Sequence, residues 1–438
     1  MAHSEPTNVL LIGGGGREHA LAAALKKSKR LGELWTTHPE NPGIAALAKA
    51  VDVPVSAKEI YRLIQFCEAK KIGMVVIGPE EPLAQGYADK LISPDRMVFG
   101  PTQAAAQLEA DKVYAKQVMR SAAIPTADAR TFTDFDNARQ YLNSRLSLEG
   151  RGNLPRLPVI KASGLAKGKG VLVPTTVDEA IDALDRIMLK KEFGEAGNTV
   201  LIEERLEGPE VSILAIVDGT NILLLPPAQD HKRLLDGDKG PNTGGMGAFC
   251  PSTIVDAKLL SQVEREILVP IVDAMRRDDI IYRGVLYVGL MLTPSGPKVL
   301  EFNCRFGDPE CQVIIPRLKS DLLELMQATA TGRLHKIDVE WDPRASCCVV
   351  MASEGYPEKP RDGQVITGLG QAAANKDVTV FHAGTKRNAQ GEIVTAGGRV
   401  LGVTALGTNL ADARQKAYAA CDKISFPGMQ YRKDIGTR

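Results

Sequence analysis

The sequence lacks a net charge of either sign. Its 54 lysines and arginines are matched by 53 aspartates and glutamates, so the formal net charge of the 438 residues is only +1. A protein that binds nucleic acids through their phosphates normally carries a basic excess. The charge balance therefore disfavours a nucleic-acid-binding protein, and we expect no nucleic acid among the partners.

Long apolar runs are missing as well. No stretch approaches the roughly 18 apolar residues that a membrane-spanning helix requires. The N-terminus has four consecutive apolar residues at 9–12 with no basic segment before them, which disfavours a secretory signal. We therefore expect no membrane contact.

Cysteine is scarce and its spacing carries no signature. There are seven cysteines, none of them in a C-x-x-C pair, and the spacing typical of zinc sites is absent. An odd number of scattered cysteines is typical of reduced thiols in a cytosolic protein. The sequence thus predicts a cytoplasmic protein.

What is present is the composition of an ordinary globular protein, with 44% apolar and 24% charged residues. The length corresponds to about three domains. Short apolar runs alternate with helical patterns at the start, which predicts an α/β fold whose N-terminal domain is a doubly wound parallel sheet. The expected strands are 9–12, 34–37, 74–77 and 97–99, and the expected helices are 17–29, 58–71 and 83–92.

The rest of the chain divides into three further units by its strands and helices. We expect domains at 1–110, 111–195, 196–335 and 336–438. Strands are predicted at 159–162, 171–173, 200–203, 211–217, 222–225, 285–292 and 299–302, and helices at 178–191, 256–277, 310–330 and 410–424.

Four glycines followed by Arg17, Glu18 and His19 come directly after the first strand. Glycines let the backbone approach an anion, and a helix N-terminus supplies free N–H groups and positive potential. A dinucleotide site is a tempting interpretation, but G-x-G-x-x-G starting at Gly13 requires glycine where Glu18 stands. The segment indicates a phosphate or phosphosugar site; the alternative is a tight strand-to-helix turn.

Residues 159–171, VIKASGLAKGKGV, form a strand, a loop rich in glycine and lysine, and a second strand. The spacing departs from the G-x-x-x-x-G-K-[ST] phosphate loop. A loop of this kind can instead close over a nucleotide triphosphate, with Lys161 directed at its phosphates. The alternative is a solvated hairpin.

The most informative segment is 299–310, VLEFNCRFGDPE. Glu301 and Asn303 are two residues apart on a strand, so they share a face, and both offer the oxygen ligands that Mg²⁺ takes beside substrate phosphates. Arg305, one strand period further, can bind a phosphoryl group. Polar groups in this pattern are costly unless their face is a site.

Two further segments are polar and less specific. Residues 229–233, QDHKR, lead into the glycine-rich stretch 240–247, which suggests a second substrate pocket in which Asp230 pairs with an amine. The strand 200–203 runs into a linker that could meet an adenine edge, and Glu210 could accept hydrogen bonds from a ribose. Surface loops remain the alternative for both segments.

Taken together, these motifs resemble the ATP-grasp superfamily, and within it the phosphoribosylamine–glycine ligase family, from about residue 8 to about 425. GGGGREHA, VIGPEEPL, FGPT, IKASGLAKGKGV, QDHKR, GPNTGGMGA and EFNCRFGDPE match that family in order. The resemblance implies a Rossmann-like first domain, an ATP-grasp core of two α+β subdomains and a small C-terminal α+β domain.

The resemblance also implies an activity: ATP-dependent ligation of glycine to 5-phosphoribosylamine in purine biosynthesis, through glycyl phosphate, by a cytoplasmic monomer or weak homodimer. It implies ATP and Mg²⁺ or Mn²⁺, with Glu301 and Asn303 as metal ligands and Arg305, Lys161 and Asp230 in catalysis. The implied ATP-binding residues are Lys112, Lys161, Gly168, Lys169, Gly170, Glu203, Glu204, Leu206 and Glu210. The implied substrate-binding residues are Gly15, Gly16, Arg17, Glu18, Asn41, Pro79, Glu80, Asp230, Lys232, Gly245, Met246, Arg305 and Asp308.

One departure from the wider superfamily leaves the number of metal ions open. Many of its enzymes supply a further metal carboxylate from the strand before the metal strand, and residues 284–291 contain none. Two other functions also stay open: an ATP-grasp enzyme acting on another carboxylate or on bicarbonate, and a non-catalytic nucleotide-binding module.

Overall fold

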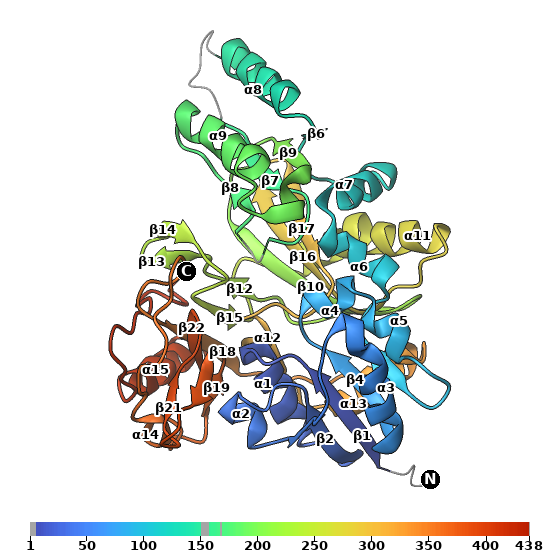
Figure 1. Cartoon of the computed structure of the whole chain (residues 1–438), viewed down its shortest axis with the longest axis vertical. Coiled ribbons are helices and arrows are strands. Elements are labelled where there is room, and N and C mark those ends of the chain that lie inside the picture. The colour runs from blue at the N-terminus through green and yellow to red at the C-terminus, as the bar shows by residue number, and fades with distance from the viewer. Residues whose placement is uncertain (1–5, 150–156, 167–168, 438) are drawn as a thin grey trace.

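The computed structural model describes residues 6–149, 157–166 and 169–437, which form three lobes (Figure 1). The first part of the chain and the last form two neighbouring lobes at the bottom of the view. The segment that carries α8 and α9 forms a third lobe above them. The central part of the chain, coloured light green to yellow, runs between the three lobes.

The N-terminal lobe is the expected parallel sheet. Its strand order is β3-β2-β1-β4-β5, and every neighbouring pair is parallel. The middle of β1 is buried, with Val9, Leu10 and Leu11 at 0% exposure, as a strand covered by helices on both faces requires. The bounds are β1 (Thr7–Ile12), β2 (Leu31–Thr36), β3 (Lys49–Ala50), β4 (Ile72–Ile77), β5 (Met97–Phe99), α1 (Gly16–Leu25), α2 (Pro42–Ala45) and α3 (Ile60–Ala69).

Two predicted helices are interrupted in the structure. The predicted helix 83–92 is divided between α4 (Glu80–Ala84) and α5 (Tyr87–Leu91), because Gly86 adopts a left-handed conformation with φ of 74°. The predicted helix 310–330 is divided between α12 (Cys311–Ile314) and α13 (Leu322–Ala330). Pro316 stands in the short 3₁₀ turn after α12, and Asp321 caps α13.

The upper lobe is an antiparallel sheet in the order β6-β9-β7-β8. Its strands are β6 (Ala129–Phe132), β7 (Val159–Ala162), β8 (Val171–Leu172) and β9 (Val200–Glu203), and α8 (Phe135–Glu149) and α9 (Val177–Leu184) accompany them. Leu142, Ile160 and Leu184 are all at 0% exposure in one small core. This core is separate from the other three, which indicates that the lobe is a packing unit of its own.

The central sheet, in the order β11-β10-β16-β17, shares a hydrophobic core with the N-terminal lobe. Leu10 of β1 belongs to the same buried cluster as Ile213 of β10 and Phe302 of β17. The elements are β10 (Glu210–Asp218), β11 (Ile222–Leu224), β16 (Arg283–Thr293), β17 (Gly296–Asn303), α6 (Gln103–Ala110), α7 (Lys112–Ser121), α10 (Ala257–Val263) and α11 (Val269–Arg277).

The C-terminal sheet draws on two distant parts of the chain. Its order is β12-β15-β18-β22-β19, so β12 (Gln229–Asp230) and β15 (Gly247–Cys250) join strands that come about a hundred residues later. The polar segment and the glycine-rich segment are thereby tied to the C-terminal lobe. The remaining elements are β13 (Arg233–Leu235), β14 (Lys239–Asn242), β18 (Ala345–Ala352), β19 (Val378–His382), β20 (Thr385–Arg387), β21 (Ile393–Thr395), β22 (Arg399–Gly407), α14 (Leu369–Ala372) and α15 (Leu410–Cys421).

Within the described ranges, no helix is both long enough and apolar enough to cross a membrane. All seven cysteines are buried and unpaired.

Candidate active site

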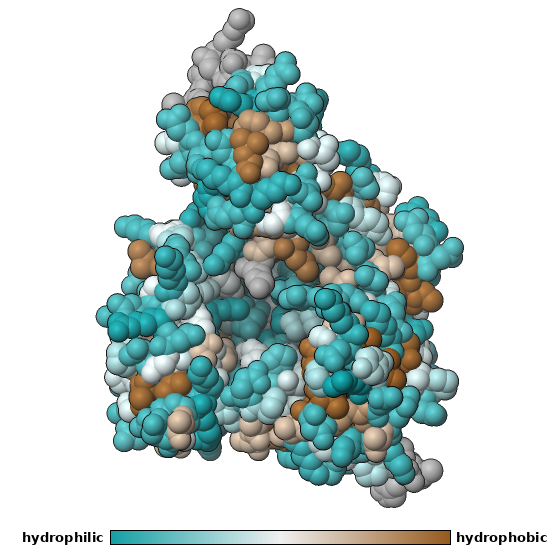
Figure 2. Space-filling model, viewed as in Figure 1, coloured by the Kyte–Doolittle hydropathy of each residue, from teal (hydrophilic) through white to brown (hydrophobic). Residues whose placement is uncertain are grey.

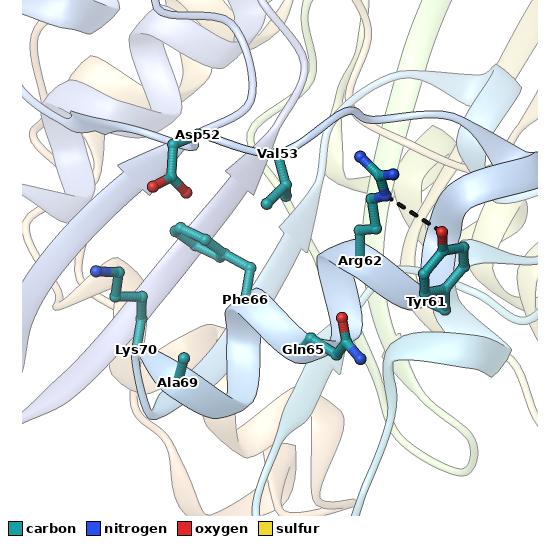
Figure 3. Close-up of a pocket in the computed structure, with 8 residues that line it drawn as sticks. All are labelled: Asp52, Val53, Tyr61, Arg62, Gln65, Phe66, Ala69 and Lys70. Atoms are coloured by element: carbon teal, nitrogen blue, oxygen red, sulfur yellow. Dashed lines mark hydrogen bonds between the residues drawn. The ribbon is translucent and has the colours of Figure 1, made fainter.

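A cleft of about 1620 Å³ is lined by residues of all three lobes. The surface is hollowed near the middle of the space-filling view, between the upper lobe and the two lower ones (Figure 2). A second, shallow pocket lies against α3 (Figure 3). It is lined by Asp52, Val53, Tyr61, Arg62, Gln65, Phe66, Ala69 and Lys70, none of which belongs to a motif singled out above. The predicted chemistry therefore belongs to the large cleft.

One buried carboxylate holds two lysines at the base of the upper lobe. Lys161 Nζ lies 2.7 Å from Glu203 Oε2, and Lys116 Nζ lies 3.4 Å from Glu203 Oε1. All three side chains are less than 10% exposed. They sit on β7, α7 and β9, so the ion pairs join α7 to the sheet. The arrangement presents fixed positive charge to the cleft, as a triphosphate requires.

Lys112, in the first turn of α7, faces the loop after β7. Its Nζ donates to the carbonyl oxygens of Gly164 at 3.1 Å and Ser163 at 3.4 Å. Asp111 caps α7 and accepts a hydrogen bond from the Ser163 hydroxyl at 2.7 Å. Burial lowers the pKa of Lys112 and outweighs the opposite effect of Glu301. These bonds fix the first half of the lysine-rich loop; Gly168 lies outside the described residues.

The linker between β9 and β10 forms one wall of the cleft. Glu204, Leu206 and Glu210, which are predicted to bind ATP, line it together with Gly170 from the far side of the loop. Burial raises the pKa of Glu210. The Glu203 carboxylate is engaged by Lys116 and Lys161, so any effect of Glu203 on a bound nucleotide would come through the positions of those lysines.

Glu301 and Asn303 both line the cleft from β17, while Phe302 between them is 2% exposed in the core. Burial raises the pKa of Glu301, but Lys232, Lys161 and Lys112 lower it further, so the net pKa lies below its ordinary value. Among the described residues no ion-pair partner lies within 4.0 Å of this carboxylate. An ionised, unpaired carboxylate beside an amide oxygen suits a hard divalent cation.

The neighbouring strand contributes no further ligand. Gly289 of β16 lies directly opposite Glu301 in the ladder, and a Cβ there would approach Glu301 Cγ to 3.2 Å. No group of three or more His, Cys, Asp or Glu side chains that could hold a metal is found in the described part of the chain. The two oxygen donors alone fit an ion that takes its other ligands from phosphates and water.

Arg305 lies just beyond the end of β17 and is held by two carboxylates of the N-terminal half. Its Nη2 lies 2.8 Å from Glu109 Oε1, and its Nε lies 3.1 Å from Glu80 Oε2. Despite burial, Glu109 and Glu80 raise the pKa of Arg305. The guanidinium therefore stays charged in the cleft. To make its predicted contact with a phosphoryl group, Arg305 would give up one of its two carboxylate partners.

The glycine turn before α1 is closed by Glu18. Gly15 N donates to Glu18 Oε2 at 2.7 Å, and Arg17 Nε lies 2.6 Å from Glu18 Oε1. The Arg17 guanidinium also donates to the carbonyl of Phe306 at 3.0 Å, and the Arg17 backbone N–H donates to Asp308 at 3.3 Å. A carboxylate thus already lies at the N-terminus of α1, as its dipole favours.

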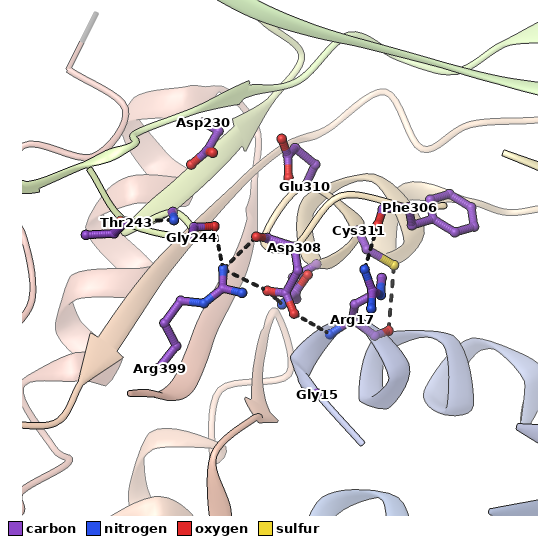
Figure 4. Close-up of polar contacts among 12 residues, drawn as sticks. Gly15, Arg17, Asp230, Thr243, Gly244, Phe306, Asp308, Glu310, Cys311 and Arg399 are labelled. Atoms are coloured by element: carbon purple, nitrogen blue, oxygen red, sulfur yellow. Dashed lines mark hydrogen bonds and ion pairs between the residues drawn. The ribbon is translucent and has the colours of Figure 1, made fainter. Parts of the chain in front are cut away.

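Asp230 and Lys232, which also line the cleft, form an ion pair of 2.7 Å. Burial raises the pKa of Asp230 to about 7, against the lowering effect of Lys232. Nearby, Glu310 accepts hydrogen bonds from Tyr287 and Ser212, both at 3.0 Å. Asp230 and Glu310 are both drawn above Asp308 in the close-up (Figure 4). A cluster with this charge can receive an ammonium group.

Some predicted residues lie outside the lining of the cleft. Met246 is completely buried, and Asn41 caps α2 while donating to the carbonyl of Gly14 at 2.8 Å. A Cβ at Gly245 would lie 2.8 Å from Asp230, so this glycine makes room for the carboxylate. Gly16 begins α1, and Lys169 is exposed. The lining includes the other predicted residues that the structure describes.

Several charged residues that line this cleft were not among the predicted site residues, including Lys116, Glu109, Glu310 and Arg399. Lys116 follows Lys112 by four residues, which places both on one face of a helix, so Lys116 could have been predicted from this spacing. Glu310 stands inside the quoted RFGDPE segment. Glu109 and Arg399 have no local signature, because long-range contacts alone bring them to the site.

Comparison with known families accounts for most of the chain. Residues 7–109, 110–311 and 346–438 match the phosphoribosylglycinamide synthetase N domain, ATP-grasp (A) domain and C domain. A phosphoribosylamine–glycine ligase of Rhodopirellula baltica is 51% identical over 98% of this chain and 97% of its own length. The human trifunctional purine biosynthetic protein adenosine-3 is 48% identical over 98% of this chain and 42% of its own length.

Comparison with solved structures supports the same assignment. The phosphoribosylamine–glycine ligase of Thermotoga maritima is 32% identical, with a TM-score of 0.82 over 98% of this chain and 100% of that one. A biotin carboxylase of Campylobacter jejuni, 16% identical with a TM-score of 0.72 over 99% and 94% of the two chains, shares the fold. The ATP-grasp expectation is confirmed, and the chain belongs to the phosphoribosylglycinamide synthetase family.

Proposed function

We propose that the chain joins glycine to 5-phosphoribosylamine, forming glycinamide ribonucleotide, ADP and phosphate in purine biosynthesis. The observation that carries the proposal is the distribution of charged residues along the large cleft. The cleft is lined by Lys112, Lys161 and the Glu301–Asn303 pair together with the linker between β9 and β10. The same lining includes Asp230 and the turn before α1. Nucleotide and acceptor can therefore be held together.

The reaction requires activation because a carboxylate has no good leaving group. In the proposed sequence, a glycine carboxylate oxygen attacks the γ-phosphorus of ATP, ADP departs, and the sugar amine then displaces phosphate from glycyl phosphate. Lys161, Lys112 and Arg305 offset the negative charge of the phosphoryl groups. Asp230 holds an amine of the substrates, which fixes the reacting groups relative to one another.

Glu301 and Asn303 would hold Mg²⁺ or Mn²⁺. The ionised state of Glu301 and its lack of an ion-pair partner among the described residues fit that role. When bound, the ion neutralises phosphate charge and orients the phosphates. A related biotin carboxylase domain from Hydrogenobacter thermophilus, which shares the fold at 16% identity, was crystallised with MgADP.

We place the sugar phosphate at the turn formed by residues 13–17. The buried Arg17 guanidinium is bonded to Glu18 and to the carbonyl of Phe306. It thus stabilises the turn, while Glu18 balances its charge. The positive potential at the N-terminal end of α1 would attract a phosphate in addition to the Glu18 carboxylate.

The test is ADP release measured with all substrates and with each one omitted. We expect release to require glycine, the sugar amine and a divalent cation together, and glycinamide ribonucleotide to form in equal amount. Bicarbonate replacing glycine should give no product. Release driven by bicarbonate or another carboxylate would favour the other ATP-grasp reactions, and absence of any release would favour a nucleotide-binding module.

We also propose a cytoplasmic enzyme that is a monomer or weak homodimer. Seven buried and unpaired cysteines support a reducing compartment.

A further inference from the structure

Arg399 is the one residue after Glu310 that lines the cleft, among the residues the structure describes. It begins β22 in the C-terminal lobe, while the rest of the lining comes from the first 310 residues. Its side chain is 24% exposed. A charged side chain in this place marks the point where the C-terminal lobe reaches the proposed site.

All the side-chain hydrogen bonds and the ion pair of Arg399 that the structure records involve one nitrogen. Nη1 donates to the carbonyl oxygen of Gly244 at 2.7 Å and to that of Asp308 at 2.6 Å, and it lies 3.3 Å from Asp308 Oδ1 (Figure 4). Both partners belong to site motifs: Gly244 to the glycine-rich segment and Asp308 to the segment after β17. The guanidinium therefore fastens two motifs together.

Asp308 carries the connection on to the N-terminal lobe. Its Oδ2 accepts from the backbone N–H of Arg17 at 3.3 Å, and its Oδ1 accepts from Gln312 at 2.8 Å. Burial raises the pKa of Asp308, but Arg399 and Arg17 lower it further, so the net pKa is below its ordinary value. An ionised carboxylate thus links Arg399 to the turn where we place the sugar phosphate.

Gly244 carries the connection toward Asp230. The neighbouring Thr243 hydroxyl donates to the Lys232 carbonyl at 2.8 Å and accepts from Gly245 N at 3.0 Å. A Cβ at Gly244 would lie 3.0 Å from Arg399 Cζ, so the loop packs tightly on the guanidinium. A shift of Arg399 would be transmitted to the wall that holds the Asp230–Lys232 pair.

We propose that Arg399 is a positioning residue for the acceptor half of the site, where glycine and the sugar amine bind, and that it acts through Asp308 and Gly244. The inference rests on the proposed function. Its side chain bonds the glycine-rich segment directly and Arg17 at the start of α1 through Asp308, and none of its recorded side-chain bonds is to the β9–β10 linker or Lys161. Loss of Arg399 should therefore disturb the acceptor half and spare the ATP half.

The experiment compares the steady-state kinetics of Arg399→Ala and Arg399→Lys with wild type. The control is Arg344→Ala, an arginine of the same lobe that pairs with Asp342 and Asp377 away from the cleft. For Arg399→Ala we expect the KM for the sugar amine or glycine to rise about tenfold, equivalent to about 1.4 kcal/mol, with the KM for ATP within twofold. Lysine should restore part of the loss, because one ammonium offers three donors but its stem is shorter.

A double-mutant cycle with Asp308→Asn tests the route of the effect. If Arg399 acts through Asp308, the KM of the double variant for the sugar amine or glycine should rise by clearly less than the product of the rises in the two single variants. A rise in the double variant equal to the product of the two single rises would overturn the positioning role. Equal rises in the KM values for ATP, glycine and the sugar amine, together with a lower Tm, would also overturn it. A wild-type protein without glycine-dependent ADP release would overturn the proposed function itself, and the inference with it.

Discussion

Single residues in the cleft owe their expected behaviour to their charged neighbours. Glu301 illustrates this, because three lysines lower the pKa of a carboxyl that burial alone would raise. The Glu301 carboxylate is therefore ionised and can bind a cation.

Replacing Glu301 with glutamine should lower kcat by about a hundredfold or more, since a metal ligand with a full charge is lost and a catalytic metal supplies several kcal/mol. Titration of Mg²⁺ should show a weaker apparent affinity. The control is Glu266→Gln, a surface glutamate paired with Arg265, which should leave turnover unchanged. Wild-type turnover by Glu301→Gln at saturating Mg²⁺ would remove Glu301 from the metal site.

Asp230 should impose a pH dependence on glycine use. Because burial raises the pKa of Asp230 to about 7, the carboxyl is neutral below that pH and ionised above it. An ammonium group is attracted only by the ionised form, so kcat/KM for glycine should rise about tenfold per pH unit toward pH 7 and then level off. The same shift makes the free energy of unfolding fall as pH rises from the ordinary value of 3.8 toward 7.

The measurement is the pH profile of kcat/KM for glycine at saturating ATP and sugar amine. Asp230→Asn should be slower and should lack the acidic limb. An identical limb in that variant would assign the titration to another group.

The residues found from sequence were those with local patterns. Glu301 and Asn303 alternate with buried Phe302, and their shared face could be predicted from spacing alone. The partners of Arg17 could not, because Phe306 and Asp308 lie 289 and 291 residues away along the chain. Glu109 could not be predicted either, because it is far from Arg305 in the sequence and contacts it only in the folded protein.

Elements, at the next scale, are joined by the same charges. Glu203 on β9 holds Lys161 on β7 and Lys116 on α7, so a single carboxylate ties two strands and a helix together. Most strands were predictable from apolar runs. Breaks within helices were less so, because the left-handed Gly86 and the 3₁₀ turn at Pro316 interrupt patterns that remain helical in their apolar spacing.

Glu203→Gln should destabilise the apoprotein by about 3–5 kcal/mol, because two buried ammonium groups lose their counter-charge. MgATP should raise the Tm of this variant more than that of wild type, since the triphosphate supplies negative charge to the same lysines. Thermal unfolding with and without MgATP measures both effects.

The matched control is Glu204→Gln without nucleotide. Glu204 is the next residue, but it is 40% exposed and 3.5 Å from Lys298, and such surface pairs contribute about 0–1 kcal/mol. Equal losses of stability in the two variants would contradict the role given to the Glu203 pairs.

For the whole molecule, the cleft is lined by residues of all three lobes, and we propose that the ATP half and the acceptor half of the reaction lie on different parts of the chain. The N-terminal parallel sheet and the ATP-grasp core could be predicted from the order of strands and motifs. The antiparallel C-terminal sheet could not, because β12 and β15 join strands far along the chain. That pairing brings Asp230 and Arg399 to one cleft.

We propose that this cleft activates glycine as an acyl phosphate before the amine attacks. Glycine labelled with ¹⁸O in both carboxylate oxygens tests this step most directly, in a complete reaction followed by mass spectrometry of the products. We expect one glycine-derived ¹⁸O in each phosphate released, the other ¹⁸O in the amide product, and ADP as the nucleotide. Unlabelled phosphate, or ¹⁸O recovered in AMP with release of pyrophosphate, would contradict it.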